Sequence, residues 1–333
     1  MTEILSRLPQ RIFITGASGC IGHYVVEALV EQTEHELFLL LRNPDKLQVD
    51  ITQRPGIHVI QGDLHNVEGF ANLLSTIDTA ILIATCWGGA NEIFEINVQA
   101  NLRLMALLDP DRCRQVIYFS TSSILDRQNQ PLPEAQTIGT DYIRSKYMCH
   151  QKLSELAIAP RITTLFPTLV FGGDDRKPYS HISAGLPEVA NWMRLIRFFQ
   201  ADGSFHFIHA KDIATVVAYL VEHPSGQPCE LVLGNPAVSA NQAVEVISRY
   251  LNQPVYFRIP LSMALADVLI KVFRLRVAAW DRFCIQYRHF THQNPVTPAS
   301  FGLTTYCTTL ADLMRATGIE SPLAASDPAT APR

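Results

Sequence analysis

Short, nearly unbroken apolar runs recur through the first half of the chain and alternate with amphipathic stretches. The runs are RIFIT (11–15), ELFLLLR (36–42), IHVIQGD (57–63), TAILIAT (79–85) and QVIYFSTSS (115–123). The stretches between them, such as residues 20–33 and 91–108, place apolar residues at helical spacing. Strands that are buried on both faces of a parallel sheet read as continuous apolar runs. The pattern therefore predicts an α/β fold with a Rossmann-type, doubly wound parallel sheet.

The regular alternation of strand-like and helix-like segments ends after ITTLFPTLVFGG (162–173). Beyond it, loops rich in Pro and Gly alternate with predicted helices and short strands. Strand-like and helix-like patterns at 205–235 predict that this segment returns to the first sheet. The expected organisation is a first domain at 1–170, a smaller substrate-binding region at 171–204 and 236–320, and a disordered, Pro-rich tail at 321–333.

Composition and charge limit the class of protein. The chain has 333 residues, of which 47% are hydrophobic and 17% charged, so it is rich enough in apolar residues to bury a full core. The formal net charge of -4 gives no basic field for binding nucleic acid. We therefore expect a globular protein with a small-molecule partner and no nucleic-acid partner.

The cysteines are odd in number and widely scattered, at Cys20, Cys86, Cys113, Cys149, Cys229, Cys284 and Cys307. They form no C-x-x-C pair, which favours reduced thiols and a cytoplasmic location over a disulfide framework or a zinc ribbon. The first ten residues lack the pattern of a secretory signal. An amphipathic run at 261–280 carries three basic residues. It is typical of a helix over a substrate pocket, and the alternatives are a membrane surface or a partner helix.

The stretch TGASGCIG, at residues 15–22, directly follows the first predicted strand and opens a helix. In this order Gly16 permits a tight turn, Gly19 lets the backbone approach a pyrophosphate, and Gly22 lets the helix pack on the strand. The helix N-terminus offers its unpaired N–H groups to the anion. This context favours a dinucleotide site over a simple glycine-rich turn.

Two charged residues lie at the ends of the next predicted strands. Arg42 lies about twenty residues beyond the glycine loop, where an arginine pairs with the 2'-phosphate of NADP; the alternative is a solvated charge. Asp63, in QGDL, is placed either to reach the adenine amine or to cap the next helix. Arg42 leads us to favour NADP(H), with NAD(H) as the alternative.

Candidate proton-transfer chemistry lies in YIRSK, where Tyr142 and Lys146 are one helical turn apart and share a face. An ammonium near a phenol lowers the phenol pKa and suits it to acid–base catalysis near neutral pH. The segment FSTSS, some twenty residues earlier at a strand end, offers hydroxyl groups for the same substrate oxygen.

These motifs resemble the extended branch of the short-chain dehydrogenase/reductase superfamily, the epimerase/dehydratase-like group. The resemblance rests on TGASGCIG, QGDL, INVQANLRLMAL, YFSTSS, YIRSK, FPTLVFGG, FHFIHAKDIA and TLADLMRATGI, in this order over most of the chain. It implies that Tyr142 is the catalytic acid/base and that Lys146 binds the nicotinamide ribose and tunes Tyr142. It further implies that Ser122, chosen over Ser123 by counting from Phe119, orients the substrate carbonyl.

The same resemblance assigns Asn97 to the catalytic set and implies a longer cofactor-binding set. That set is Gly16, Ser18, Gly19, Cys20, Ile21, Gly22, Arg42, Asp63, Leu64, Ala84, Tyr142, Lys146, Pro167 and Val170. No metal is expected, because the histidine pairs 206/209 and 289/292 lack an added carboxylate in the arrangement of known zinc sites.

Departures from the family pattern bear on the substrate. Nucleotide-sugar dehydratases of this branch usually carry Thr-Asp-Glu where this chain has Thr-Ser-Ser, and dehydration needs an acid and a base at the sugar. We therefore expect an NADP(H)-dependent oxidoreductase that interconverts a carbonyl and a secondary alcohol on a small, largely apolar molecule. The alternatives are an NAD-dependent epimerase of a sugar nucleotide and a catalytically idle dinucleotide-binding scaffold or redox sensor. A homodimer is compatible with each of them.

Overall fold

The computed structural model describes residues 9–262 and 278–321. Their contacts divide the chain into two compact units. Unit 1 comprises Met1–Thr121, Asp141–Phe166 and Ile213–Leu231, and unit 2 comprises Ser122–Thr140, Pro167–Asp212 and Val232–Arg333. Most of the amphipathic run at 261–280 and all but the first residue of the predicted disordered tail lie outside the described residues. The domain boundaries expected from the sequence stay a prediction.

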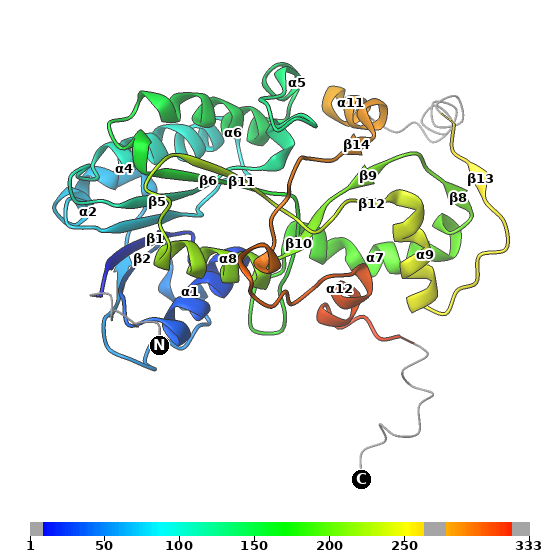
Figure 1. Ribbon diagram of the computed structural model, residues 1–333, viewed down its shortest axis with the longest axis horizontal. Coiled ribbons are helices and arrows are strands. Elements are labelled where there is room, and N and C mark those ends of the chain that lie inside the picture. The colour runs from blue at the N-terminus through cyan, green and yellow to red at the C-terminus, as the bar shows by residue number, and fades with distance from the viewer. Residues whose placement is uncertain (1–8, 263–277, 322–333) are drawn as a thin grey trace, which may run out of the picture. The chain divides into compact units, whose positions relative to one another are not determined.

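A seven-stranded sheet forms the centre of unit 1, in the order β11-β6-β5-β4-β1-β2-β3 (Figure 1). Its strands are β1 Arg11–Thr15, β2 Glu36–Leu41, β3 Ile57–Gln61, β4 Thr79–Leu82, β5 Gln115–Phe119, β6 Ile162–Pro167 and β11 Cys229–Leu233. The pairs β1–β2, β2–β3, β1–β4, β4–β5 and β5–β6 are parallel. The chain winds from β1 to β3 on one side and then from β4 outward on the other, which confirms the doubly wound fold.

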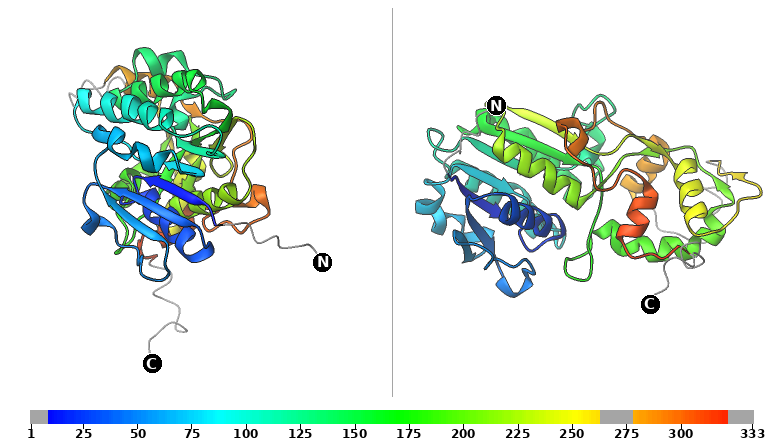
Figure 2. Two further views of the ribbon diagram at one scale, coloured as in Figure 1. Left: turned by 90° about the vertical axis from the view of Figure 1, so that its left-hand side faces the viewer. Right: turned by 60° about the horizontal axis from the view of Figure 1, so that its bottom comes forward.

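Helices cover both faces of this sheet. Helices α4 (Asn101–Ala106) and α6 (Asp141–Lys152) lie on one face, and α1 (Cys20–Gln32) and α8 (Ala210–Glu222) lie on the other (Figures 1 and 2). Short helical segments complete the connections: η1 Pro44–Lys46, η2 Leu64–Phe70, α2 Ala71–Leu74, α3 Ala90–Phe94, η3 Glu95–Ala100, η5 Leu153–Glu155 and η6 Ala159–Arg161. The segment η3 is a π-helical turn between α3 and α4.

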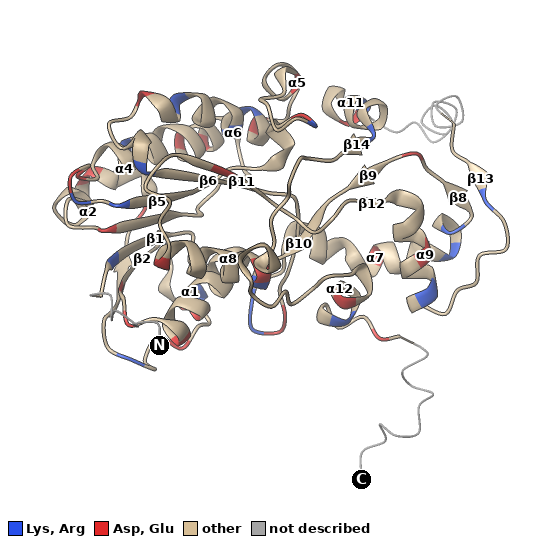
Figure 3. Cartoon of the chain, in the orientation of Figure 1, with Lys and Arg blue, Asp and Glu red and all other residues tan. Residues whose placement is uncertain are grey.

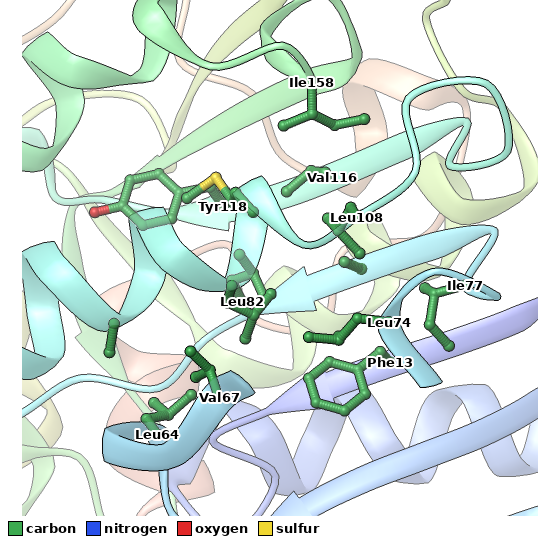
Figure 4. Close-up of a cluster of buried hydrophobic side chains, with 14 of the residues drawn as sticks. Phe13, Leu64, Val67, Leu74, Ile77, Leu82, Leu108, Val116, Tyr118 and Ile158 are labelled. Atoms are coloured by element: carbon green, nitrogen blue, oxygen red, sulfur yellow. The ribbon is translucent and has the colours of Figure 1, made fainter. Parts of the chain in front are cut away.

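The apolar core of unit 1 lies between the sheet and the helices of one face. Phe13 of β1, Leu82 of β4 and Val116 of β5 are fully buried there and belong to one cluster with Leu74 and Leu108 (Figure 4). Because these strands bury both faces, their side chains hold the carboxyl ends of β1, β4 and β5 in a fixed arrangement. Those ends carry the segments that form the candidate site.

Unit 2 contains three small sheets in place of one large one. They are β10-β7 (Phe207–His209, Leu169–Phe171), β12-β9-β14 (Val238–Ser239, Ser204–Phe205, His289–Phe290) and β13-β8 (Ile259–Pro260, Phe199–Gln200). Its helical segments are η4 Ser122–Ile124, α5 Pro133–Thr137, α7 His181–Ile196, α9 Ala240–Tyr250, α11 Ala279–Tyr287, η7 Pro298–Phe301 and α12 Leu310–Ala316. A cluster that includes Phe171, Leu186 and Leu313 forms its core.

Charged residues of both signs are interspersed along the described part of each unit (Figure 3). This distribution agrees with the small net charge of the sequence. Within residues 9–262 and 278–321, no helix has the length and apolar character needed to cross a bilayer.

Candidate active site and cofactor loop

The glycine loop between β1 and α1 is packed so closely at Gly16 and Gly22 that neither can be replaced without movement of the backbone. Gly16 has a φ of +76°, and a Cβ there would lie 2.6 Å from the amide nitrogen of Ala84. A Cβ on Gly22 would lie 2.0 Å from the carbonyl oxygen of Gly16. The Thr15 hydroxyl accepts a hydrogen bond from Ala84 N at 3.3 Å, which joins the ends of β1 and β4.

The first turn of α1 begins at this loop without an anionic or capping side chain. Gly19 is the N-cap residue, no side chain caps the helix, and the first turn holds no acidic residue. Ser18, Cys20 and Ile21 are partly exposed around it. A helix N-terminus with no capping or acidic side chain suits a pyrophosphate, and the binding of a dinucleotide by these residues stays a prediction.

Arg42 follows the end of β2 and Asp63 follows the end of β3, and their charges lie close enough to interact. Arg42 is exposed, one residue after β2. Asp63 is the N-cap of η2, and its side chain accepts hydrogen bonds from His65 N at 2.9 Å and His65 Nδ1 at 2.5 Å. Burial raises the pKa of Asp63, but these bonds and the charges of His65 and Arg42 outweigh it and leave the pKa below its usual value. Asp63 thus caps η2, and its reach to adenine stays a prediction, as does the cofactor role of the buried Leu64.

Lys146 lies in the second turn of α6 and is almost completely buried, with 2% of its surface exposed. Its Nζ donates a hydrogen bond to the carbonyl oxygen of Phe119, at the end of β5, at 2.8 Å. Burial disfavours the charged form and lowers the pKa of Lys146 to about 8. The ammonium is therefore held at the carboxyl end of the sheet by a single backbone acceptor among the described residues.

Tyr142, one turn before Lys146, contacts two residues that the sequence did not indicate. Its ring stacks on Trp87, with the centroids 3.7 Å apart and the planes at 17°. Its phenol shares a side-chain hydrogen bond with Thr121, two residues beyond β5. Burial raises the pKa of the Tyr142 phenol well above its usual value, and the bond from Thr121 opposes this. That the Lys146 ammonium lowers this pKa stays a prediction.

Thr121 is a functional candidate that sequence reasoning missed. The segment FSTSS presents several hydroxyl groups, and counting from Phe119 led to Ser122. Ser122 is buried at the start of η4, and its role stays a prediction. Ser120, between Phe119 and Thr121, is buried, and its hydroxyl has no hydrogen-bond partner among the described residues. An orphaned hydroxyl at the carboxyl end of a central strand is available to a bound cofactor or substrate.

Asn97 is buried in η3 and connects two parts of the site. Its Oδ1 accepts hydrogen bonds from Cys86 N at 2.7 Å and from the Thr85 hydroxyl at 3.1 Å. Its Nδ2 donates to Cys86 O at 3.0 Å and to Ser145 Oγ at 3.0 Å. The side chain therefore fixes the segment after β4 and ties it to α6. Pro167, at the end of β6, and Val170, in β7, belong to unit 2, and their position beside a nicotinamide stays a prediction.

The histidine pairs make hydrogen bonds within unit 2. His206 Nδ1 bonds to Asn235 O at 2.8 Å, and His206 Nε2 accepts a hydrogen bond from His292 N at 2.9 Å. Across residues 9–262 and 278–321, no three His, Cys, Asp or Glu side chains are grouped so as to hold a metal ion.

Solved structures resemble the chain in fold at low sequence identity. The terminal R domain of the myxalamid PKS-NRPS biosynthetic pathway is 17% identical with a TM-score of 0.69, and the match covers 96% of this chain and 91% of that one. The Bordetella bronchiseptica enzyme WbmG, solved with NAD and UDP, is 15% identical with a TM-score of 0.62, over 95% and 94%. The dTDP-glucose 4,6-dehydratase of Bacillus anthracis, solved with NAD, is 12% identical with a TM-score of 0.62, over 93% and 96%.

A curated relative matches only part of the chain. Quinone oxidoreductase 2 of Escherichia coli K12 is 28% identical over 122 residues, which are 36% of this chain and 39% of that protein. A family model matches a much longer segment, from residue 12 to residue 234, and so includes the glycine loop, Tyr142 and Lys146. The chain belongs to the NAD dependent epimerase/dehydratase family and is an NAD(P)-dependent enzyme of the extended short-chain dehydrogenase/reductase type.

Proposed function

We propose that the protein is an NADP(H)-dependent oxidoreductase that interconverts a carbonyl and a secondary alcohol on a small, largely apolar organic substrate. One observation carries the proposal: the hydrogen-bonded phenol of Tyr142 and the buried ammonium of Lys146 lie one helical turn apart at the carboxyl end of β5. This pairing supplies a proton donor and a nearby cation, the two elements that carbonyl reduction requires of the protein.

The nicotinamide cofactor supplies or accepts the hydride when it is bound. In the reducing direction the Tyr142 hydroxyl donates its proton to the carbonyl oxygen, and the phenolate then recovers a proton from solvent. In the oxidising direction the phenolate oxygen takes the proton of the alcohol. The Thr121 hydroxyl holds the phenol oxygen in place, Ser122 is the predicted donor to the substrate oxygen, and the Lys146 charge favours the phenolate.

The preference for NADP(H) rests on Arg42. An exposed guanidinium at the end of β2 is free to form paired, charge-assisted hydrogen bonds with a 2'-phosphate. Fluorescence titrations with NADPH and NADH test this on the parent and on Arg42→Asp. We expect the parent to bind NADPH about 10- to 150-fold more tightly, from contacts of roughly 1.5 to 3 kcal/mol, and the variant to lose or invert the preference. Equal binding of both cofactors by the parent would favour the NAD-dependent epimerase.

The substrate class rests on the residues directly after β5. Ser122 and Ser123 stand where dehydratases of this branch carry carboxylates, so the acid and base for dehydration are absent at these two positions. A set of carbonyl compounds mixed with the protein and NADPH, followed by the absorbance of the reduced cofactor, identifies the substrate. An epimerase would retain its cofactor through purification and show no net oxidation, and an idle scaffold would bind the cofactor without turnover.

Tyr142→Phe tests the role of the phenol in the reaction found in this way. The variant removes only the hydroxyl, so we expect a loss of about 100- to 10,000-fold in kcat with cofactor affinity nearly unchanged. Tyr147→Phe, on the same helix, is the matched control and should retain activity. Full activity in Tyr142→Phe would contradict the proposed proton transfer.

A further inference from the structure

Trp87 lies against the proposed proton donor, although it is far from it in the sequence. Its side chain is 52% exposed, and its ring stacks on Tyr142 with centroids 3.7 Å apart and planes at 17°. Large aromatic side chains are usually buried, and an exposed tryptophan placed on a functional residue needs an explanation. Neither the glycine loop nor the Tyr142 and Lys146 pair explains it.

The backbone just before Trp87 is fixed by hydrogen bonds that lead to Tyr142 itself. Asn97 accepts from Cys86 N at 2.7 Å and donates to Cys86 O at 3.0 Å. Asn97 also donates to Ser145 Oγ at 3.0 Å, and the Ser145 hydroxyl donates to the carbonyl oxygen of Tyr142 at 2.7 Å. Cys86, the residue before Trp87, and the backbone of Tyr142 therefore belong to one hydrogen-bonded network.

The backbone just after Trp87 is hydrogen-bonded, since Gly88 O accepts from the Cys86 thiol at 3.4 Å and Gly89 O from Ile93 N at 2.9 Å, but it is less closely packed. A Cβ on Gly88 would have no neighbour within 4 Å, and Gly89 has a φ of +70° and directly precedes α3. No close packing on that side therefore directs the indole onto Tyr142. The hydrogen bonds at Cys86 fix the chain before the indole, and the stack on Tyr142 is a contact that holds the indole itself.

We propose, on the basis of the proposed function, that Trp87 is a positioning residue whose indole holds the Tyr142 ring where its hydroxyl exchanges a proton with the substrate. A phenol ring turns about two side-chain bonds, and a small displacement of its oxygen breaks the alignment with Thr121 and the substrate. A misplacement of about 1 Å at a reacting group costs up to about 100-fold in rate. Trp87 acts by preventing that movement.

Trp87→Ala and Trp87→Phe test the role with the substrate found by the carbonyl screen. We expect kcat to fall about 10- to 100-fold in Trp87→Ala, with KM and the cofactor Kd within about 3-fold of the parent. Trp87→Phe keeps an aromatic face and should recover most of the rate. Met148→Ala, which removes another exposed apolar side chain (39%) from α6 in the same unit, is the control and should retain the parent kcat.

A double-mutant cycle decides whether Trp87 acts through Tyr142. In the Tyr142→Phe background no hydroxyl remains to be positioned, so Trp87→Ala should reduce kcat by less than about 2-fold further. The proposal is overturned by a further loss as large as in the parent background, which would make Trp87 an independent substrate contact. A parent-like kcat in Trp87→Ala also overturns it.

A measurement without substrate separates this inference from the proposed function. The stacked rings should give an aromatic circular dichroism signal that disappears in Trp87→Ala and in Tyr142→Ala, and that persists in Tyr142→Phe because the ring remains. Loss of the signal in only one of the two alanine variants contradicts the stack. If Tyr142→Phe is fully active, the proposed function fails whatever the signal shows. If Tyr142→Phe is inactive and Trp87→Ala is normal, only the positioning role fails.

Discussion

The two units bury their apolar residues in different ways. Unit 1 sets strands of four to six residues side by side in one sheet, and Ile12, Phe13 and Ile14 of β1 are fully buried. Unit 2 uses strands of two or three residues in three small sheets and leaves Trp192, Tyr256 and other large apolar side chains exposed. A rigid sheet holds catalytic and cofactor groups to within fractions of an ångström, whereas short strands joined by loops accommodate changes in sequence.

This difference separates two kinds of task within the chain. The glycine loop, Asn97, Thr121, Tyr142 and Lys146 all belong to unit 1. Substitutions that disturb unit 1 should therefore affect cofactor binding and stability together, while substitutions in the core of unit 2, away from the predicted site residues Ser122, Pro167 and Val170, should affect mainly stability and by less.

The largest effect should come from Gly22→Ala, because the added Cβ would lie 2.0 Å from the Gly16 carbonyl oxygen. Backbone atoms on both sides must move, so we expect the free energy of unfolding to fall by about 3 kcal/mol or more and dinucleotide binding to be lost. Gly69→Ala, where a Cβ meets nothing within 4 Å, is the matched control in the same unit. Urea unfolding and a cofactor titration measure both effects, and parent-like binding in Gly22→Ala would contradict the packing argument.

The next effect concerns Lys146, whose contribution to the free energy of unfolding should change with pH in a defined direction. Burial lowers the pKa of Lys146 in the folded protein to about 8, against 10.5 in the unfolded chain. Between these values the unfolded state binds more protons, so the parent gains stability as the pH rises from about 8 to 10.5. Relative to Lys146→Met, we expect the gain to reach at most about 3 kcal/mol, since one pKa unit is about 1.4 kcal/mol.

Unfolding of the parent and Lys146→Met at pH 7 and pH 10 measures this difference. The stability of Lys146→Met relative to the parent should be greater at pH 7 than at pH 10. The variant should also bind the dinucleotide less tightly than the parent. A stability difference that does not change with pH would place the ammonium in contact with solvent.

Unit 2 also contains a buried polar residue, Asp212, whose loss should destabilise the protein clearly. Asp212 is fully buried, and its carboxylate accepts hydrogen bonds from Tyr306 N at 2.6 Å and Cys307 N at 3.1 Å. Asp212→Ala leaves both donors unpaired, so we expect a loss of about 2 kcal/mol. Asp202→Ala, at an exposed carboxylate paired with Arg288, is the control and should cost less than about 1 kcal/mol. Equal effects of the two variants would contradict the anchoring role.

The smallest effect should be a gain in the free energy of unfolding. Gly185 lies within α7 in unit 2, and a Cβ there would meet nothing within 4 Å. Alanine loses less backbone entropy than glycine on folding, so Gly185→Ala should raise the free energy of unfolding by about 0.5 to 1 kcal/mol. A loss of stability, measured by urea unfolding, would show that this face of α7 is covered.

Local features and the parallel sheet, whose buried strands read as apolar runs, could be predicted from the sequence, whereas contacts between single side chains far apart in the chain could not. The order of β1, glycine loop and α1 is local, and so is the spacing of Tyr142 and Lys146 on one helical face. The contact between Trp87 and Tyr142 joins segments 55 residues apart in the chain, which no local pattern indicates. The choice of Thr121 over its neighbours depends on how the chain turns after β5, and the two-residue strands β8 and β13 exist only because they pair with each other.

The order of the large sheet has a consequence for synthesis on the ribosome. Strand β6 ends at Pro167, but its outer neighbour β11 begins only at Cys229, so about 60 residues must be made between them. At about 5 to 20 residues per second this takes roughly 3 to 12 s. During that interval a strand that is completely buried in the finished enzyme presents an unpaired edge, which is a template for aggregation. Nascent chains that stop before β11 should therefore depend on chaperones, and those that include it should not.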